Sequence, residues 1–112
     1  MSQETSDFRV DPETMADLEA IVERADPDPS LEIFKALADQ RRILIMRLLG
    51  ESELCVCDLI AIFDVEYSKL SYHLQVLKDA GLVTADREGN YVTYAPTERG
   101  DEVIEIVRDL CC

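Results

Sequence analysis

The chain has 112 residues, which is enough for one compact domain but not for two independent cores. Hydrophobic residues make up 47% of it, which excludes a chain too polar to fold, and no stretch approaches the roughly 20 apolar residues of a membrane span. The formal net charge of -13 leans against nucleic-acid binding, because nucleic-acid-binding domains are usually basic. The charge lies mostly at the ends, however. Residues 1–32 hold ten acids against two arginines, whereas residues 33–95 hold nine acids against seven bases.

The first residues are acidic and polar, without the basic-then-apolar order of a secretory signal, so we expect a cytoplasmic protein. Cysteines in that compartment are normally reduced. The four cysteines form two close pairs, Cys55 with Cys57 and Cys111 with Cys112. Paired thiols are more typical of metal ligands or redox groups than of core residues.

Three helices are predicted in the first half of the chain. The first begins where Asp11 can cap and Pro12 can occupy the first helical position, and it ends before the prolines at 27 and 29. A second helix follows from about residue 31 to 38. A third runs over Gln40–Leu49, with Asp39 as its cap and Gly50 as its end.

The second half predicts two successive helices, a hairpin and a closing helix. The helices cover Leu54–Phe63 and Glu66–Ala80 and are separated by two residues, as in a helix-turn-helix. Two strands, Leu82–Ala85 and Tyr91–Tyr94, flank a turn at residues 86–90, in which Gly89 and Asn90 can take positive φ. Thr97 can cap the last helix. We therefore expect a mainly α protein with a small β-hairpin wing (α+β), a single winged helix-turn-helix domain over residues 1–112.

The helix over Glu66–Ala80 separates into two stripes. Leu70, Leu74 and Leu77 share the face that must meet the core. The opposite stripe offers hydroxyl, amide, phenol and ammonium groups and no carboxylate, and its members are Ser68, Lys69, Ser71, Tyr72, Gln75 and Lys78. These groups hydrogen-bond base edges and phosphates, so the pattern predicts a recognition helix that enters the major groove of DNA.

Two further residues are candidates for DNA contact. His73, the only histidine, flanks the core side of the same helix. It could be a partly buried histidine bonded to a carbonyl, or it could contact phosphate at the groove edge. Arg87 lies near the hairpin tip and could contact phosphates or the minor groove, although Asp86 and Glu88 beside it weaken that case.

Four segments in order along residues 31–100 carry a resemblance to a known family: LEIFKALADQRRILIMRLLG, ELCVCDL, SKLSYHLQVLKDAGLV and YVTYAPTERG. The chain resembles the ArsR/SmtB family of metal-sensing repressors. The resemblance implies a homodimer paired through its first helix (residues 1–28, with a linker) and its last helix (97–112), which leaves its operator when metal binds. It also implies a helix-turn-helix at 54–80 and a wing at 82–95. The chain departs from the family in three respects. Ile60 stands where arsenic sensors often have a third cysteine, and residues 97–112 hold no histidine for a zinc site. The pair Cys111 and Cys112 is not part of the common pattern.

Cys55 and Cys57 are the candidate metal ligands. On a regular helix, residues two apart point about 200° from one another, so both can hold one ion only where the backbone is not regular helix. A helix start meets that condition and also favours the thiolate. A soft ion held there would distort the first helix of the helix-turn-helix. The other ligands would be Cys111 or Cys112, from the same chain or from the partner.

No constitutive cofactor is expected, and the inducer is open. As(III) and Sb(III), which prefer three sulfurs, are favoured over Cd(II) and Pb(II), which take three or four, and sulfur donors disfavour Mg, Ca and Mn. A thiol redox or persulfide sensor, switched by a disulfide between the two cysteine clusters, is the alternative. An enzyme is not predicted, since the chain has one histidine, no Ser–His–Asp set and no phosphate loop. The expected partners are double-stranded operator DNA and a second copy of the chain, and no membrane.

Overall fold

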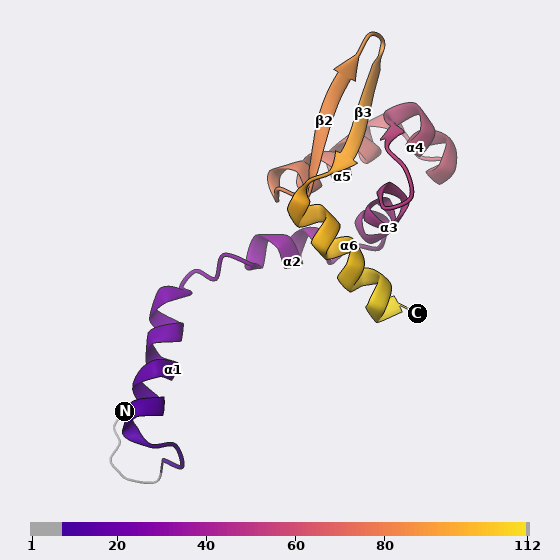
Figure 1. Cartoon of the computed structure of the whole chain (residues 1–112). Coiled ribbons are helices and arrows are strands. Elements are labelled where there is room, and N and C mark those ends of the chain that lie inside the picture. Colours follow the sequence, from indigo (N-terminus) through magenta and orange to yellow (C-terminus); the bar gives the residue numbers. More distant parts are fainter. Residues whose placement is uncertain (1–7, 112) are drawn as a thin grey trace. The chain divides into compact units, whose positions relative to one another are not determined.

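The computed structural model describes residues 8–111, which form six helices and a three-stranded antiparallel sheet (Figure 1). The chain divides into two compact units, one up to Leu31 and one from Glu32 onward. The elements in chain order are α1 (Pro12–Arg24), α2 (Leu31–Leu37), α3 (Gln40–Leu49), β1 (Leu54–Cys55), α4 (Val56–Phe63), α5 (Tyr67–Asp79), β2 (Val83–Glu88), β3 (Tyr91–Pro96) and α6 (Glu98–Cys111). The predicted architecture, mainly helical with a hairpin wing, is confirmed.

The first unit consists mainly of α1. Its start is the predicted one, since Pro12 opens the helix and the Asp11 carboxylate accepts a hydrogen bond from the Thr14 amide at 2.9 Å. No residue of α1 is buried, and Leu18, Ile21 and Val22 are exposed. The helix therefore presents an apolar face that its own unit does not cover.

Side-chain caps fix the starts of two helices in the second unit. The Asp39 carboxylate accepts from the Arg41 amide at 2.9 Å and from the Arg42 amide at 3.3 Å, as expected for the cap of α3. The Thr97 hydroxyl accepts from the Gly100 amide at 2.9 Å and donates to the Gly81 carbonyl at 2.7 Å. Thr97 thus caps α6 and also ties it to the turn after α5.

The predicted helix over Leu54–Phe63 is wrong at its first two residues. Leu54 and Cys55 form β1, which pairs with β3 so that Leu54 lies opposite Tyr94 and Cys55 opposite Thr93. The physical reason is that β3 supplies hydrogen-bond partners for these backbone groups, and α4 begins only at Val56. The sheet order is β1-β3-β2, so the wing has a third strand.

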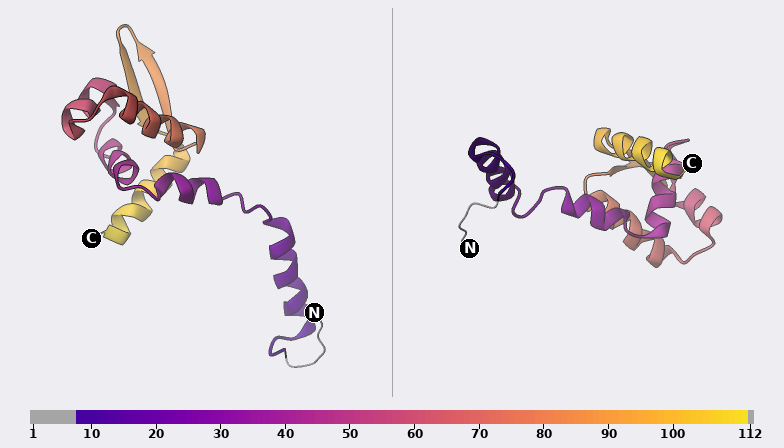
Figure 2. Two further views of the ribbon diagram at one scale, coloured as in Figure 1. Left: turned by 180° about the vertical axis from the view of Figure 1, so that it is seen from behind. Right: turned by 90° about the horizontal axis from the view of Figure 1, so that it is seen from below.

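The wing is longer than predicted. Strands β2 and β3 pair from Val83 opposite Pro96 to Glu88 opposite Tyr91, and the hairpin extends beyond the helices of its unit (Figures 1 and 2). In the turn, Gly89 takes a positive φ of 62°, but Asn90 does not. Only the glycine of the predicted turn pair therefore uses the left-handed conformation.

The core lies between α3, α5, α6 and the base of the sheet. As predicted, α5 contributes three leucines that are at most 1% exposed, Leu70, Leu74 and Leu77. They pack in one cluster with Ile45, Met46, Leu49, Leu59, Leu82, Val83, Val103, Ile104 and Val107. Helix α6 lies beside α3 (Figure 2). This packing fixes which face of α5 remains outside. No helix in the described part of the chain is long and apolar enough to cross a membrane.

Candidate functional site

The outer face of α5 holds the six residues predicted to contact DNA. Five are exposed, Ser68, Lys69, Tyr72, Gln75 and Lys78, and Ser71 is half-buried. They lie opposite the buried leucines, so the core holds this helix with its polar stripe toward solvent. Contact of the stripe with DNA remains a prediction.

One expectation about this stripe is wrong. Asp79 is exposed at the C-terminal end of α5, and its carboxylate accepts a hydrogen bond from Nε2 of Gln75 at 2.8 Å. Residues four apart on a helix share a face, so the stripe ends in a carboxylate that the sequence analysis left out. Gln75 would have to release Asp79 to direct its amide nitrogen at a base.

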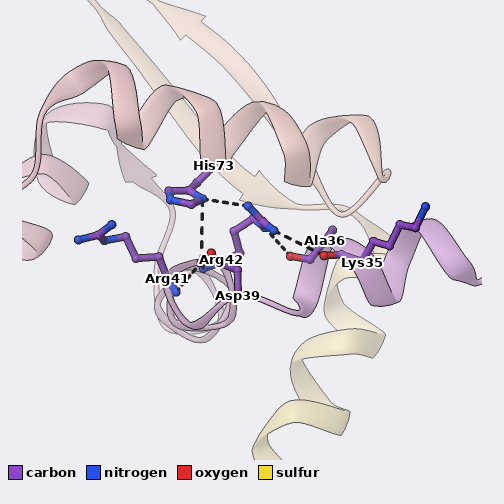
Figure 3. Close-up of polar contacts among 6 residues, drawn as sticks. All are labelled: Lys35, Ala36, Asp39, Arg41, Arg42 and His73. Carbon is purple, nitrogen blue, oxygen red and sulfur yellow. Dashed lines mark hydrogen bonds and ion pairs between the residues drawn. The ribbon is translucent and has the colours of Figure 1, made fainter.

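His73 lies on the inner side of α5 and is 9% exposed. Its Nδ1 is 3.0 Å from Nη1 of Arg42, and Arg42 also donates from Nε to the Ala36 carbonyl at 2.6 Å (Figure 3). A guanidinium is always a donor, so Nδ1 accepts and the proton of the neutral ring lies on Nε2. The sequence suggested a carbonyl as the hydrogen-bond partner of His73, whereas the observed partner is the guanidinium of Arg42 on the neighbouring helix α3.

Burial, together with the two neighbouring arginines, favours the neutral ring of His73. Burial lowers the pKa of His73 from its usual 6.5, the Asp39 carboxylate 4.0 Å away raises it, and the charges of Arg42 and Arg41 lower it again. For Asp39, burial raises the pKa, but the amides of Arg42 and Arg41 and the charges of His73 and Arg42 bring it below its usual 3.8. The two groups thus settle as a neutral imidazole and a carboxylate.

The backbone at Cys55 is not regular helix, which is the condition that two cysteines two residues apart need to hold one ion. Cys55 is the N-cap of α4 with extended dihedrals, φ -84° and ψ 166°, and Cys57 lies in the first turn. Their Cα atoms are 5.3 Å apart and their sulfurs are joined in a disulfide. This differs from the expected reduced pair, and the disulfide lies within one cluster and not between the two. The extended Cys55 backbone brings both sulfurs to the same side of the helix start.

Asp58 is a functional candidate that the sequence analysis missed. Its carboxylate accepts from the Cys55 amide at 3.0 Å, and its own amide donates to Sγ of Cys55 at 3.3 Å, which makes a reciprocal capping box. The ligand atoms of Cys55, Cys57 and Asp58 all lie within 4.8 Å of one another. The signal was present, since an acid three residues after an N-cap is the usual capping-box pattern.

An open hollow of about 400 Å³ adjoins the two cysteines. Its walls come from α4, the start of α5 and the wing, and they are Cys55, Val56, Cys57, Ile60, Tyr67, Arg87, Asn90, Tyr91 and Val92. Arg87, predicted to contact DNA, is exposed here, and its Nη1 is 3.5 Å from the Gly89 carbonyl. Cys111 is exposed at the end of α6 and is not part of the donor group at Cys55, while Cys112 lies outside the described residues.

The chain is 46% identical over 82 residues to the arsenical resistance operon repressor of Bacillus subtilis, a match that covers 70% of this chain and 75% of the relative. Residues 39–85 match the model of the bacterial regulatory proteins of the arsR family. The chain belongs to the arsR family. The matched residues run from the cap of α3 through the cysteine pair and α5 into β2.

The chain is also similar to a second transcriptional regulator and to a solved winged helix-turn-helix domain. The chain is 42% identical over 62 residues to the cadmium resistance transcriptional regulatory protein CadC of Listeria innocua, covering 54% of this chain and 52% of CadC. The homodimeric winged helix-turn-helix domain of Mb0332 from Mycobacterium bovis superposes with a TM-score of 0.70 at 31% identity, covering 79% of this chain and 82% of that domain. This arsR-family chain is therefore a winged helix-turn-helix transcriptional regulator and not an enzyme.

Proposed function

We propose that this protein is a homodimeric repressor that binds operator DNA through α5 and is released when As(III) or Sb(III) binds Cys55 and Cys57. The observation that carries the proposal is the donor group at the start of α4, where two sulfurs and the Asp58 carboxylate lie within 4.8 Å. The relatives named for arsenical and for cadmium resistance support a metal response. We expect the protein to act in the reducing cytoplasm, where the disulfide would open to two thiols.

DNA binding is assigned to the outer face of α5 and to the wing. Tyr72, Gln75 and the two serines would contact base edges, whereas Lys69 and Lys78 would contact phosphates. Arg87 would reach phosphate or the minor groove from the wing. His73 is too buried to be a main contact, and we assign it the role of holding α5 against Arg42.

Dimer formation follows from exposed apolar side chains at both ends of the chain. Leu18 and Val22 of α1 are 45% and 70% exposed, and Ile106 and Leu110 of α6 are 58% and 81% exposed. Uncovered apolar faces of this kind are typical of protein interfaces. The homodimeric Mb0332 domain supports the same assembly. We therefore infer pairing through the first and last helices.

The position of Cys55 explains how ion binding would change the arrangement of the DNA-binding elements. Cys55 is the last residue of β1, paired with Thr93 of the wing, and it is also the N-cap of α4. Sulfurs drawn onto an ion would therefore displace both the wing strand and the first helix of the helix-turn-helix. A ligand that binds one arrangement of these elements more tightly lowers the population of the other arrangement, and it lowers the apparent affinity for DNA when DNA binds that other arrangement.

The donor set favours As(III) or Sb(III) over Cd(II) or Pb(II). Two thiolates supply most of a three-coordinate sulfur site but only half of a four-coordinate one. We propose that the third donor is Cys111 or Cys112, from the same chain or from its partner, with Asp58 as the nearer but harder oxygen donor.

A redox repressor of the same fold is the second candidate, and the disulfide between Cys55 and Cys57 favours it. Oxidation of the two thiols would then change the start of α4 without any ion. The experiment that separates the candidates measures the anisotropy of a fluorescent DNA duplex, selected for binding, with the fully reduced protein. Release by arsenite under anaerobic conditions supports the metalloid sensor. Release only by peroxide or persulfide, with none by arsenite or cadmium, would replace it with the redox sensor.

A further inference from the structure

Gln75 and Asp79 are joined by a hydrogen bond on the outer face of α5. Nε2 of Gln75 donates to Oδ1 of Asp79 at 2.8 Å, and both side chains are exposed. Leu74 and Leu77, which are at most 1% exposed, hold the opposite side of the helix in the core, so the helix cannot turn this pair away from solvent. The pair therefore belongs to the face assigned above to DNA.

The hydrogen bond fixes which end of the Gln75 amide faces outward. An ionised carboxylate only accepts hydrogen bonds, so it must be the amide nitrogen that faces Asp79. Turning the amide over would place Oε1 against Oδ1, two acceptors with no hydrogen between them. Oε1 therefore stays on the side away from Asp79 and offers an acceptor to a group that approaches the helix. A glutamine without such a partner can present its nitrogen or its oxygen equally well.

The place of Asp79 in the helix favours an indirect role in DNA binding. It is the last residue of α5, where the helix dipole is negative and a carboxylate is unfavourable. A carboxylate near DNA also repels phosphates. A recognition helix contacts base edges mainly through its N-terminal part, and Asp79 lies one turn beyond Gln75. Its favourable contact is with Gln75, and through Gln75 it would act on DNA.

We propose, in an inference that rests on the DNA binding proposed above, that Asp79 is a positioning residue that sets the base preference of Gln75. In the major groove, adenine and cytosine offer amino hydrogens, whereas guanine and thymine offer keto oxygens as acceptors. Oε1 of Gln75 can accept from an amino group but meets a keto oxygen as a second acceptor. The pair therefore selects adenine or cytosine on the strand that Gln75 contacts and rejects guanine or thymine.

The test selects binding sites for the reduced, full-length protein from a pool of randomised DNA duplexes and sequences them. Gln75→Ala locates the base pair that Gln75 contacts, because the preference there is lost. At that base pair the wild type should bind duplexes with adenine or cytosine on the contacted strand about tenfold more tightly than duplexes with guanine or thymine. Asp79→Asn should reduce this ratio to less than about threefold, because an amide can donate to Oε1 as well as accept from Nε2.

Glu32→Gln is the matched control, because it removes one negative charge from a carboxylate that pairs with a different side chain. Glu32 lies on α2 beside an open hollow that Asp79 also lines, and its carboxylate is 3.9 Å from Nζ of Lys35. Both substitutions should raise the affinity for all duplexes through charge, whereas only Asp79→Asn should change the ratio of amino to keto bases. The ratio is therefore a readout that a general charge effect or a loss of helix stability would not move.

An unchanged ratio in Asp79→Asn, or an equal loss in Glu32→Gln, would overturn the positioning role while binding to specific duplexes stood. Preferences in Gln75→Ala that match the wild type at every position would overturn it as well, since Gln75 would then read no base. A wild type that binds all duplexes alike would overturn operator recognition and the role of Asp79 together.

Discussion

Nη1 of Arg42 lies 3.0 Å from Nδ1 of His73 and joins the first turn of α3 to the buried side of α5. The same guanidinium donates to the carbonyls of Ala36 and Lys35 at the end of α2 (Figure 3). Three helices thus meet at one side chain directly behind the face predicted to contact DNA. An acceptor nitrogen on His73 is essential to this contact, because a protonated ring could not accept from Arg42.

The first prediction concerns pH. The folded state lowers the pKa of His73 below 6.5, so the unfolded chain binds more protons between that lowered value and 6.5. The contribution of His73 to the free energy of unfolding is therefore complete above about pH 6.5, and it is lost as the pH falls toward the pKa of His73 in the folded protein. The melting temperature should fall between about pH 7.5 and about pH 5.5, and His73→Gln should remove part of that dependence. Identical pH profiles of the two proteins would contradict the assignment.

The second prediction separates phosphate contacts from base contacts on α5. Lys69→Ala should weaken binding to all DNA sequences alike and reduce the salt slope by about 1. Gln75→Ala should instead relax the preference at one base pair, by about 1–3 kcal/mol. Binding curves at several salt concentrations measure both effects. Lys35→Ala, an exposed lysine on α2, is the control and should leave the slope unchanged.

The third prediction concerns the cysteine pair. Cys55→Ser and Cys57→Ser should each leave DNA affinity intact and abolish release by arsenite. Serine is a good N-cap, so it can accept from the Asp58 amide in place of the Cys55 sulfur and preserve the start of α4. Operator anisotropy with and without arsenite measures both properties. Loss of DNA binding in either variant would show that the cysteines are structural.

The fourth prediction tests the C-terminal tail. Joint replacement of Cys111 and Cys112 by serine should lower the affinity for arsenite, because As(III) prefers three sulfurs. X-ray absorption at the arsenic edge should then give a sulfur coordination number closer to two than to three for bound arsenite. An unchanged arsenite affinity would remove the tail from the site.

The fifth prediction concerns packing beneath the wing. A Cβ on Gly100 would collide with the carbonyl oxygen of Leu82 and come within 3.2 Å of Cβ of Pro96. Gly100→Ala should therefore lower the free energy of unfolding by about 1–3 kcal/mol. Glu98→Ala, at an exposed position of the same helix, is the control. Chemical denaturation measures both, and equal midpoints would contradict the predicted clash.

Local patterns were enough to predict most of the fold. The three helix caps predicted from local sequence are present in the structure, at Asp11, Asp39 and Thr97. They could be predicted because an N-cap side chain accepts from amides only two or three residues further along the chain. The buried leucines of α5 followed from helical spacing in the same way.

The features that were missed depend on residues far apart in the chain. β1 exists because Cys55 pairs with Thr93, and His73 finds its partner Arg42 on another helix. The hollow needs the wing to fold over α4 before it has walls. Asp58 is the exception, because its capping role was visible in the local sequence.

In the capping box at the start of α4, the Asp58 carboxylate has two roles that exclude one another, as acceptor for the Cys55 amide and as a candidate ligand for an ion. While Asp58 accepts from the Cys55 amide, its Oδ2 helps to hold the beginning of the helix in place. An ion that recruited this oxygen would leave the amide without its acceptor, and the helix would begin less firmly. Binding of the ion and weakening of the helix start would then occur together. The allosteric change would begin where the hydrogen bond from the Cys55 amide to Asp58 is replaced by a bond from Asp58 to the ion.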